Sequence, residues 1–111
     1  MTDKRLVMYS RSTFLCPYVQ IAERILHKYS VPYSEVDIDT DTAARSRVLE
    51  WTGFLSVPTL VIAEGEDVMP YEPPAALTEA SPRGIDRGVM ITEPSGKQLE
   101  NWLRKHGFLD A

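Results

Sequence analysis

The sequence contains a single cysteine, Cys16, placed where a helix is expected to begin. Pro17 follows it directly, and proline suits the first turn of a helix because its missing N–H would have no partner there. Unpaired backbone N–H groups and the positive end of the helix dipole gather at such a start and stabilise a thiolate over a thiol. Arg11, in the preceding polar stretch, adds a positive charge nearby. Cys16 is therefore the candidate nucleophile; the alternative is a buried, inert cysteine.

A lone cysteine limits the chemistry that the chain can carry out. It cannot form a disulfide within the chain, so any redox reaction must pass through a mixed disulfide with another molecule. It also excludes an all-cysteine metal site within one chain, and no metal is expected.

Apolar periodicity places Cys16 between a strand and the first of three helices. Residues 6–10 are an apolar run typical of a buried strand, whereas 33–39 alternate between apolar and charged residues, as in a strand with one wet face. The two strands are expected to be parallel across the intervening helix. Further strands are predicted at 59–63 and 88–92, and helices from Pro17 to about 29, from a Thr40 or Asp41 cap to about 52, and from a Ser95 cap to about 106.

The resulting order is β-α-β-α-β-β-α, an α/β fold with helices on both faces of the sheet. Residues 64–87, between the last two strands, form a segment that we call the Pro-rich loop. A loop of this length inside a compact domain is either functional or disordered, and the sequence leaves both readings open. We expect one domain over residues 1–111, with the Pro-rich loop inserted in it.

Several polar residues are interpreted as structural. His27 and His106 lie near helix C-terminal ends, where a positive charge is favourable, rather than in a catalytic or metal-binding arrangement. The acids in and after the alternating strand are typical of a solvated strand face rather than a cation site; they are Glu35, Asp37, Asp39 and Asp41.

The composition is that of an ordinary globular protein. The 111 residues are 43% hydrophobic and 25% charged, enough apolar material for one core. The net charge of −4 and the lack of a basic tract argue against nucleic acid and anionic membranes as partners. No apolar run approaches the length of a membrane helix or a signal peptide, so we expect a cytoplasmic location.

Two short motifs, in this order, resemble the active site of the glutaredoxin family. Cys-Pro-Tyr at 16–18 is similar to the start of the family's Cys-Pro-Tyr-Cys site. Thr-Gly at 52–53 and Ser-Val-Pro-Thr at 56–59 are similar to its Thr-Gly and Thr-Val-Pro segment. The resemblance implies a thioredoxin-like fold, a four-stranded mixed sheet flanked by three helices. It also implies that Pro58 is cis and faces the cysteine, and that Val57 offers backbone N–H and C=O groups to the cysteinyl part of glutathione.

The chain departs from the family pattern in ways that shape the implied mechanism. Val19 replaces the second cysteine. This implies a monothiol mechanism, in which Cys16 attacks a glutathionylated thiol, becomes glutathionylated, and is released by a second glutathione. The start of the last helix lacks the family's paired acids, and backbone N–H groups at Ser95 and Gly96 are left to hold a carboxylate. The family topology places the turn between the last two strands, here the Pro-rich loop, away from the cysteine.

The first helix also resembles that of omega-like glutathione S-transferases. These enzymes share the Cys-Pro-Tyr start and a following Val-Pro-Tyr, here at 31–33, and their Thr-Glu-Ser turn is similar to Ile-Thr-Glu at 91–93 with Ser95 displaced by one residue. They carry an additional helical domain of which this chain has no trace. The glutaredoxin family is therefore the first expectation.

The resemblance implies a monothiol, glutathione-dependent thiol–disulfide oxidoreductase. Its co-substrate is glutathione, and its other partners are glutathionylated proteins or small disulfides. Two alternatives stay open: a non-catalytic thioredoxin-fold binding module, and a carrier of an iron–sulfur cluster bridged by two Cys16 thiolates and two glutathiones. In the first reading Cys16 is the nucleophile, and the glutathione site is formed by Arg11, Tyr18, Val57, Pro58, Ser95 and Gly96.

Overall fold

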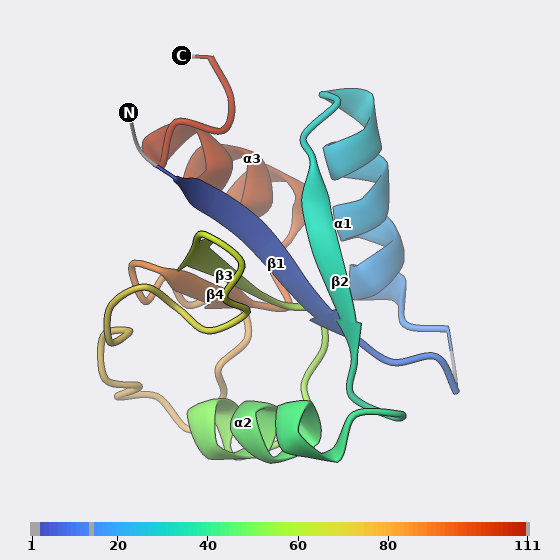
Figure 1. The fold of residues 1–111 in the computed structure, drawn as a ribbon. Helices are drawn as coiled ribbons and strands as arrows, with labels where there is room; N and C mark the ends of the chain where they lie inside the picture. Colours follow the sequence, from blue (N-terminus) through green and yellow to red (C-terminus); the bar gives the residue numbers. More distant parts are fainter. Residues whose placement is uncertain (1–2, 14, 111) are drawn as a thin grey trace.

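The computed structural model describes residues 3–13 and 15–110, and its centre is a four-stranded sheet of order β2-β1-β3-β4 (Figure 1). β1 and β2 are parallel, whereas β3 is antiparallel to both β1 and β4. The predicted element order and the mixed sheet are confirmed. The strands are β1 (Lys4–Ser10), β2 (Tyr33–Asp37), β3 (Thr59–Glu64) and β4 (Met90–Thr92), and the helices are α1 (Pro17–Lys28), α2 (Thr42–Thr52) and α3 (Gly96–Lys105).

Two apolar cores lie on opposite faces of the sheet. α1 and α3 cover one face and α2 covers the other (Figure 1). Successive side chains of a strand point to opposite faces, and β1 therefore contributes Leu6 and Met8 to the core under α1 and α3 but Val7 and Tyr9 to the core under α2. Each fully buried Leu or Met contributes about 1.5–3 kcal/mol. β1 is thus the element that joins both cores, and it ends in the loop that leads to Cys16.

Local sequence signals set the helix ends. Asp41 caps α2 by accepting a hydrogen bond from the Ala44 N–H at 3.0 Å. Gly53 ends α2 in the left-handed region at φ 81°, where glycine has no steric cost. At α3, Ser95 and Gln98 form a reciprocal capping box. No helix within residues 3–13 and 15–110 has the length and apolar character that crossing a membrane requires.

His106 differs from its expected role as a charge at a helix end. It follows α3 and its ring packs edge-on against Trp102, with centroids 5.2 Å apart. Burial, and then the positive charge of Lys105, lower the pKa of His106. The positive charge expected at this helix end is therefore disfavoured at His106 by burial and by Lys105.

The Pro-rich loop is tied to the fold at several points along its length. Near its start, the Tyr9 hydroxyl donates to the Val68 carbonyl and the Tyr71 N–H donates to the Ile62 carbonyl at 3.0 Å. Near its end, the loop returns along the outer edge of β4 (Figure 1), where the Gly84 N–H donates to the Thr92 carbonyl at 2.7 Å. Both ends of the loop are therefore attached to the central sheet.

Arg87 links the Pro-rich loop to α2 from a buried position. Arg87 is only 7% exposed, and this burial lowers the pKa of its guanidinium. Nε donates to the Ala75 carbonyl at 2.8 Å, and a terminal nitrogen donates to the Trp51 carbonyl at 2.6 Å. Trp51 lies in the last turn of α2, where carbonyl groups lack helical partners and attract a cation. The guanidinium thus joins the middle of the loop to the helix end that precedes the 56–59 motif.

Candidate active site

Cys16 lies at the start of α1, as predicted. It is the N-cap residue, with extended backbone angles (φ −109°, ψ 123°), and Pro17 begins the helix. Its thiol is partly buried and donates to the Val57 carbonyl, with the Sγ–O distance at 3.3 Å. The Val57–Pro58 peptide bond is cis, as the resemblance implied. The two sequence motifs, more than forty residues apart, therefore meet at the sulfur.

A pocket of about 350 Å³ opens beside the cysteine. One part of its wall comes from the segment before the cis proline, and the other part comes from the Pro-rich loop and the residue after β4. The lining residues are Cys16, Phe54, Leu55, Ser56, Val57, Ser81, Pro82, Arg83 and Glu93. A pocket of this volume fits a small-molecule ligand.

The expectation that the Pro-rich loop lies away from the cysteine is wrong for residues 81–83, which line the pocket, whereas the start of the loop lies at the other end of β1, where the Gly65 N–H donates to the Asp3 carbonyl at 2.9 Å. β4 is antiparallel to β3, and β3 is antiparallel to β1, so the C-terminal ends of β1 and β4 lie at the same end of the sheet. The loop returns along β4 and pairs with Thr92 at that end through a bridge at Arg83. Residues 81–83 are carried to the pocket by this pairing, which the sequence pattern did not reveal.

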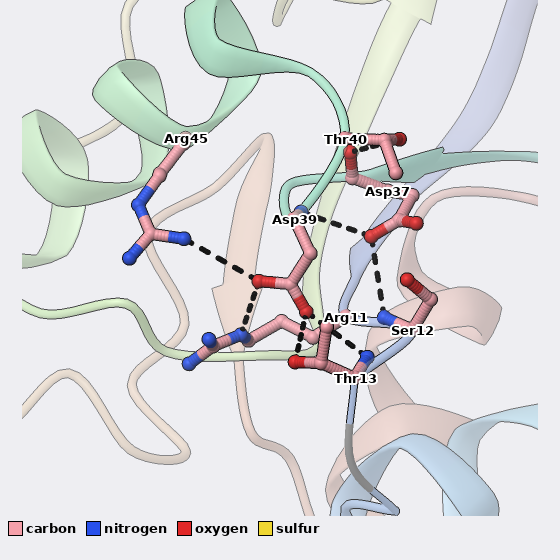
Figure 2. A network of polar contacts seen from close by, with 7 residues as sticks. All are labelled: Arg11, Ser12, Thr13, Asp37, Asp39, Thr40 and Arg45. Carbon is pink, nitrogen blue, oxygen red and sulfur yellow. Dashed lines mark hydrogen bonds and ion pairs between the residues drawn. The ribbon is translucent and has the colours of Figure 1, made fainter.

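Asp39 organises the loop that leads from β1 to Cys16 (Figure 2). Its carboxylate is only 5% exposed. It accepts from Arg11 Nε at 2.8 Å, from the Thr13 hydroxyl at 2.6 Å and N–H at 3.1 Å, and from Arg45 of α2 at 3.4 Å. Asp37 adds a second anchor because it accepts from the Ser12 N–H at 3.2 Å. The two acids together bind the backbone N–H groups of Ser12 and Thr13 in this loop.

Reading these acids as a solvated strand face is therefore wrong for Asp37 and Asp39. β2 ends at Asp37, so Asp39 is no longer bound by strand alternation and turns toward the loop. Hydrogen bonds chiefly from the Thr13 hydroxyl, then from its N–H and from Arg11, lower the pKa of Asp39 in spite of its burial. Hydrogen bonds from Ser12 and from the Asp39 backbone lower the pKa of Asp37. The alternation gave no signal for this role.

The Asp39 contacts predict a defined response to acid. Because the folded pKa of Asp39 is lowered, its contribution to stability is complete above the unfolded value near 3.8 and is lost as pH falls through the lower folded value. We expect the Thr13 amide to keep its protection from hydrogen exchange at pH 4–5. Asp39→Asn should remove that protection at every pH, as measured by NMR.

The matched control is Asp110→Asn, at an exposed position after α3. It should leave Thr13 protection unchanged, and the amides of α1 in the same samples report any global unfolding. Loss of Thr13 protection already near pH 5 in the wild type would contradict the assigned role of Asp39.

The other predicted site residues are placed differently. Tyr18 lies beneath Arg83, whose Cζ is 5.0 Å from the centre of the tyrosine ring. Arg11 is held in the Asp39 contacts rather than in the pocket wall. Ser95 and Gly96 begin α3, and the Ser95 N–H already donates to Gln98 Oε1 at 2.8 Å. A ligand carboxylate that binds the Ser95 N–H would have to displace the Gln98 side chain.

Sequence reasoning missed two charged residues of the pocket, Arg83 and Glu93. They form an ion pair at 3.2 Å. Glu93 has a positive φ of 47° and donates its N–H to the Pro58 carbonyl at 2.8 Å. Glu93 directly follows a predicted strand, and this position could have indicated a residue near the site. Arg83 lies in a loop without hydrophobic periodicity, so its position could not be inferred from the sequence.

The sheet order, the cis proline opposite the cysteine and the cysteine at a helix start define a thioredoxin-like protein. A model of one family, described as Glutaredoxin, matches residues 6–68, more than half of the chain. The chain therefore belongs to the glutaredoxin family, whose members are thiol–disulfide oxidoreductases that use glutathione as a co-substrate. No curated protein sequence shows a significant match to the chain.

Proposed function

We propose that the protein is a monothiol, glutathione-dependent thiol–disulfide oxidoreductase that acts through a mixed disulfide on Cys16. The observation that carries this proposal is the meeting of the Cys16 thiol and the Val57 carbonyl, 3.3 Å apart, at the wall of a ligand-sized pocket. Family membership supports the same chemistry. The glutathione pool of the cytoplasm is the proposed setting.

The proposed reaction has two exchange steps. In the first, the Cys16 thiolate attacks the glutathione sulfur of a mixed disulfide; the new Cys16–glutathione bond forms, and the substrate sulfur leaves as a thiolate that takes a proton from water. In the second, a glutathione thiolate attacks this adduct, which releases glutathione disulfide and the Cys16 thiolate. One glutathione is thus oxidised, one glutathione disulfide forms and one substrate thiol is restored. Val19 offers no thiol that would compete with the second glutathione.

The backbone around Cys16 supports its role as nucleophile. Pro17 has no N–H, so the first helical N–H groups that can face the sulfur belong to Tyr18 and Val19. The thiol donates to Val57, and deprotonation ends that bond and leaves an anion at the positive end of the α1 dipole. The Val57 backbone would then bind the cysteinyl part of glutathione, next to Pro58. Ser95 and Gly96 would bind a carboxylate after the Gln98 side chain moves.

The second candidate function is a non-catalytic binding module. One observation favours it: the Ser95 N–H, proposed to bind a ligand, is engaged within the protein by Gln98. In this reading the pocket binds a ligand without thiol exchange at Cys16.

Reaction of Cys16 with glutathione disulfide separates the two functions. A nucleophilic Cys16 beside the pocket should give a glutathione adduct, detected by mass spectrometry, faster than 2-mercaptoethanol reacts with the same disulfide under the same conditions. A protein that binds glutathione but forms no adduct on Cys16 would favour the binding module.

A further inference from the structure

The last part of the Pro-rich loop is a fixed wall of the pocket at Cys16. We call residues 81–83 the arm. Pro82, at its centre, is buried. The arm is held from its C-terminal side, because Arg83 forms a parallel bridge with Thr92 and the Gly84 N–H donates to the Thr92 carbonyl. A wall held by β4 presents its side chains to a ligand in a defined position.

Among the described residues that line the pocket, Arg83 is the only cation. Its guanidinium lies 5.0 Å from the centre of the Tyr18 ring and 3.2 Å from Glu93 Oε2. The bond to Glu93 uses one of the five N–H donors of a guanidinium. The side chain of Arg83 is 57% exposed, whereas that of Glu93 is 14% exposed. The aromatic ring and the carboxylate therefore orient a cation that a ligand can still reach.

Glu93 occupies a backbone conformation that favours glycine. Its φ is 47°, and a non-glycine residue in this region costs on the order of 1 kcal/mol or more. The bond from its N–H to the Pro58 carbonyl at 2.8 Å fixes the residue beside the cis proline. This backbone conformation places the Glu93 carboxylate where it binds Arg83 at the pocket, although the two residues are 10 positions apart in the sequence.

We propose that Arg83 is a specificity-determining residue that selects thiol ligands and disulfides bearing a carboxylate, and that Glu93 and Tyr18 position it. The inference rests on the proposed function in that the ligand reacts at Cys16. Arg83 pairs with carboxylates through two parallel hydrogen bonds, which gives it direction as well as charge. The chain as a whole carries −4 and repels anions at long range, so a preference for an anionic ligand requires a local cation.

The test compares two small symmetric disulfides that differ in charge: 3,3′-dithiodipropionate, which is anionic, and bis(2-hydroxyethyl) disulfide, which is neutral. With each of them the Cys16 thiolate attacks one sulfur, a mixed disulfide forms on Cys16, and the other half leaves as a thiolate and is protonated. The rate of adduct formation is followed by mass spectrometry. The anionic-to-neutral rate ratio is divided by the same ratio for 2-mercaptoethanol, which removes the intrinsic reactivity of the disulfides.

We expect the wild-type protein to show a normalised preference for the anionic disulfide of about tenfold, which Arg83→Gln lowers about five- to tenfold. Arg83→Lys should keep part of the preference, because it keeps the charge without the paired donors. Glu93→Gln should raise the preference, because the amide oxygen can still accept from Arg83 and keep it in position, whereas the negative charge that competes with the ligand for the guanidinium is removed. Arg24→Gln is the matched control: it makes the same change of charge at an exposed position of α1 and should leave the ratio unchanged.

The outcomes separate this inference from the proposed function. If Cys16 reacts with both disulfides but Arg83→Gln leaves the ratio at its wild-type value, the role of Arg83 is wrong and the proposed function stands. An equal fall of the ratio in Arg24→Gln would assign the effect to net charge and would also overturn it. If Cys16 forms an adduct with neither disulfide, the proposed function itself fails.

Discussion

Cys16→Ser is expected to lower the rate of deglutathionylation at least about 10³-fold, because a hydroxyl replaces the only sulfur nucleophile of the chain. Serine is close to cysteine in size, and Cys16 makes no side-chain cap hydrogen bond that the exchange could remove, so the pocket and the start of α1 should be kept. The measurement is release of glutathione from a glutathionylated peptide with glutathione as the reductant. Binding of glutathione by the same variant, measured by calorimetry, shows whether the pocket survives the exchange.

The matched control is Ser30→Ala, which removes a hydroxyl at an exposed position after α1 and should keep wild-type turnover. Turnover by Cys16→Ser within tenfold of the wild type would contradict a Cys16 mechanism. Absence of turnover in both the wild type and the variant, together with retained glutathione binding, would establish the binding module instead.

Arg87→Met is expected to lower the free energy of unfolding by about 2–4 kcal/mol, because it removes a buried charged donor that binds two backbone carbonyls. These carbonyls belong to Ala75 in the Pro-rich loop and Trp51 at the end of α2. Methionine fills much of the same volume, so the expected loss comes from the hydrogen bonds rather than from a cavity. Urea denaturation followed by circular dichroism measures the change, and limited proteolysis should cut the loop faster in the variant.

Arg104→Met is the control for this change. Arg104 also donates to a backbone carbonyl, that of Asp110, but it is exposed, and its replacement should shift stability by no more than about 0.5 kcal/mol. Equal stability of the wild type and Arg87→Met would mean that the cost of burying the guanidinium cancels its hydrogen bonds. In that case Arg87 would not be what holds the loop to α2.

The elements that carry local signals could be predicted from the sequence. The Pro17 start of α1 depends on the fixed φ of proline, and the end of α2 at Gly53 depends on a left-handed φ that glycine adopts readily. The Ser95 cap is equally local. The approach of Cys16 to Val57 is long-range, and it was predicted only because both motifs resemble those of a known family.

The features that the sequence did not predict depend on the path of irregular backbone. Asp39 follows the last residue of β2, so the period of two no longer governs its direction, and a carboxylate in an alternating pattern proved to be a buried acceptor. The arm reaches the pocket because residues 83–86 pair with β4, and this pairing lies in a loop without hydrophobic periodicity. Hydrophobic patterns indicate which face of a helix or strand is buried, and neither Asp39 nor the arm lies in a helix or strand.

The bridges between the Pro-rich loop and β4 have a consequence for self-association. β4 is an edge strand in the order β2-β1-β3-β4, and an edge strand without a neighbour offers its free N–H and C=O groups to a second molecule. Bridges from Arg83 to Thr92 and from Asp86 to Ile91 cover part of this edge with the chain's own backbone. Cleavage of the loop would release these groups, and the nicked protein would then gain a tendency to join copies strand to strand into aggregates.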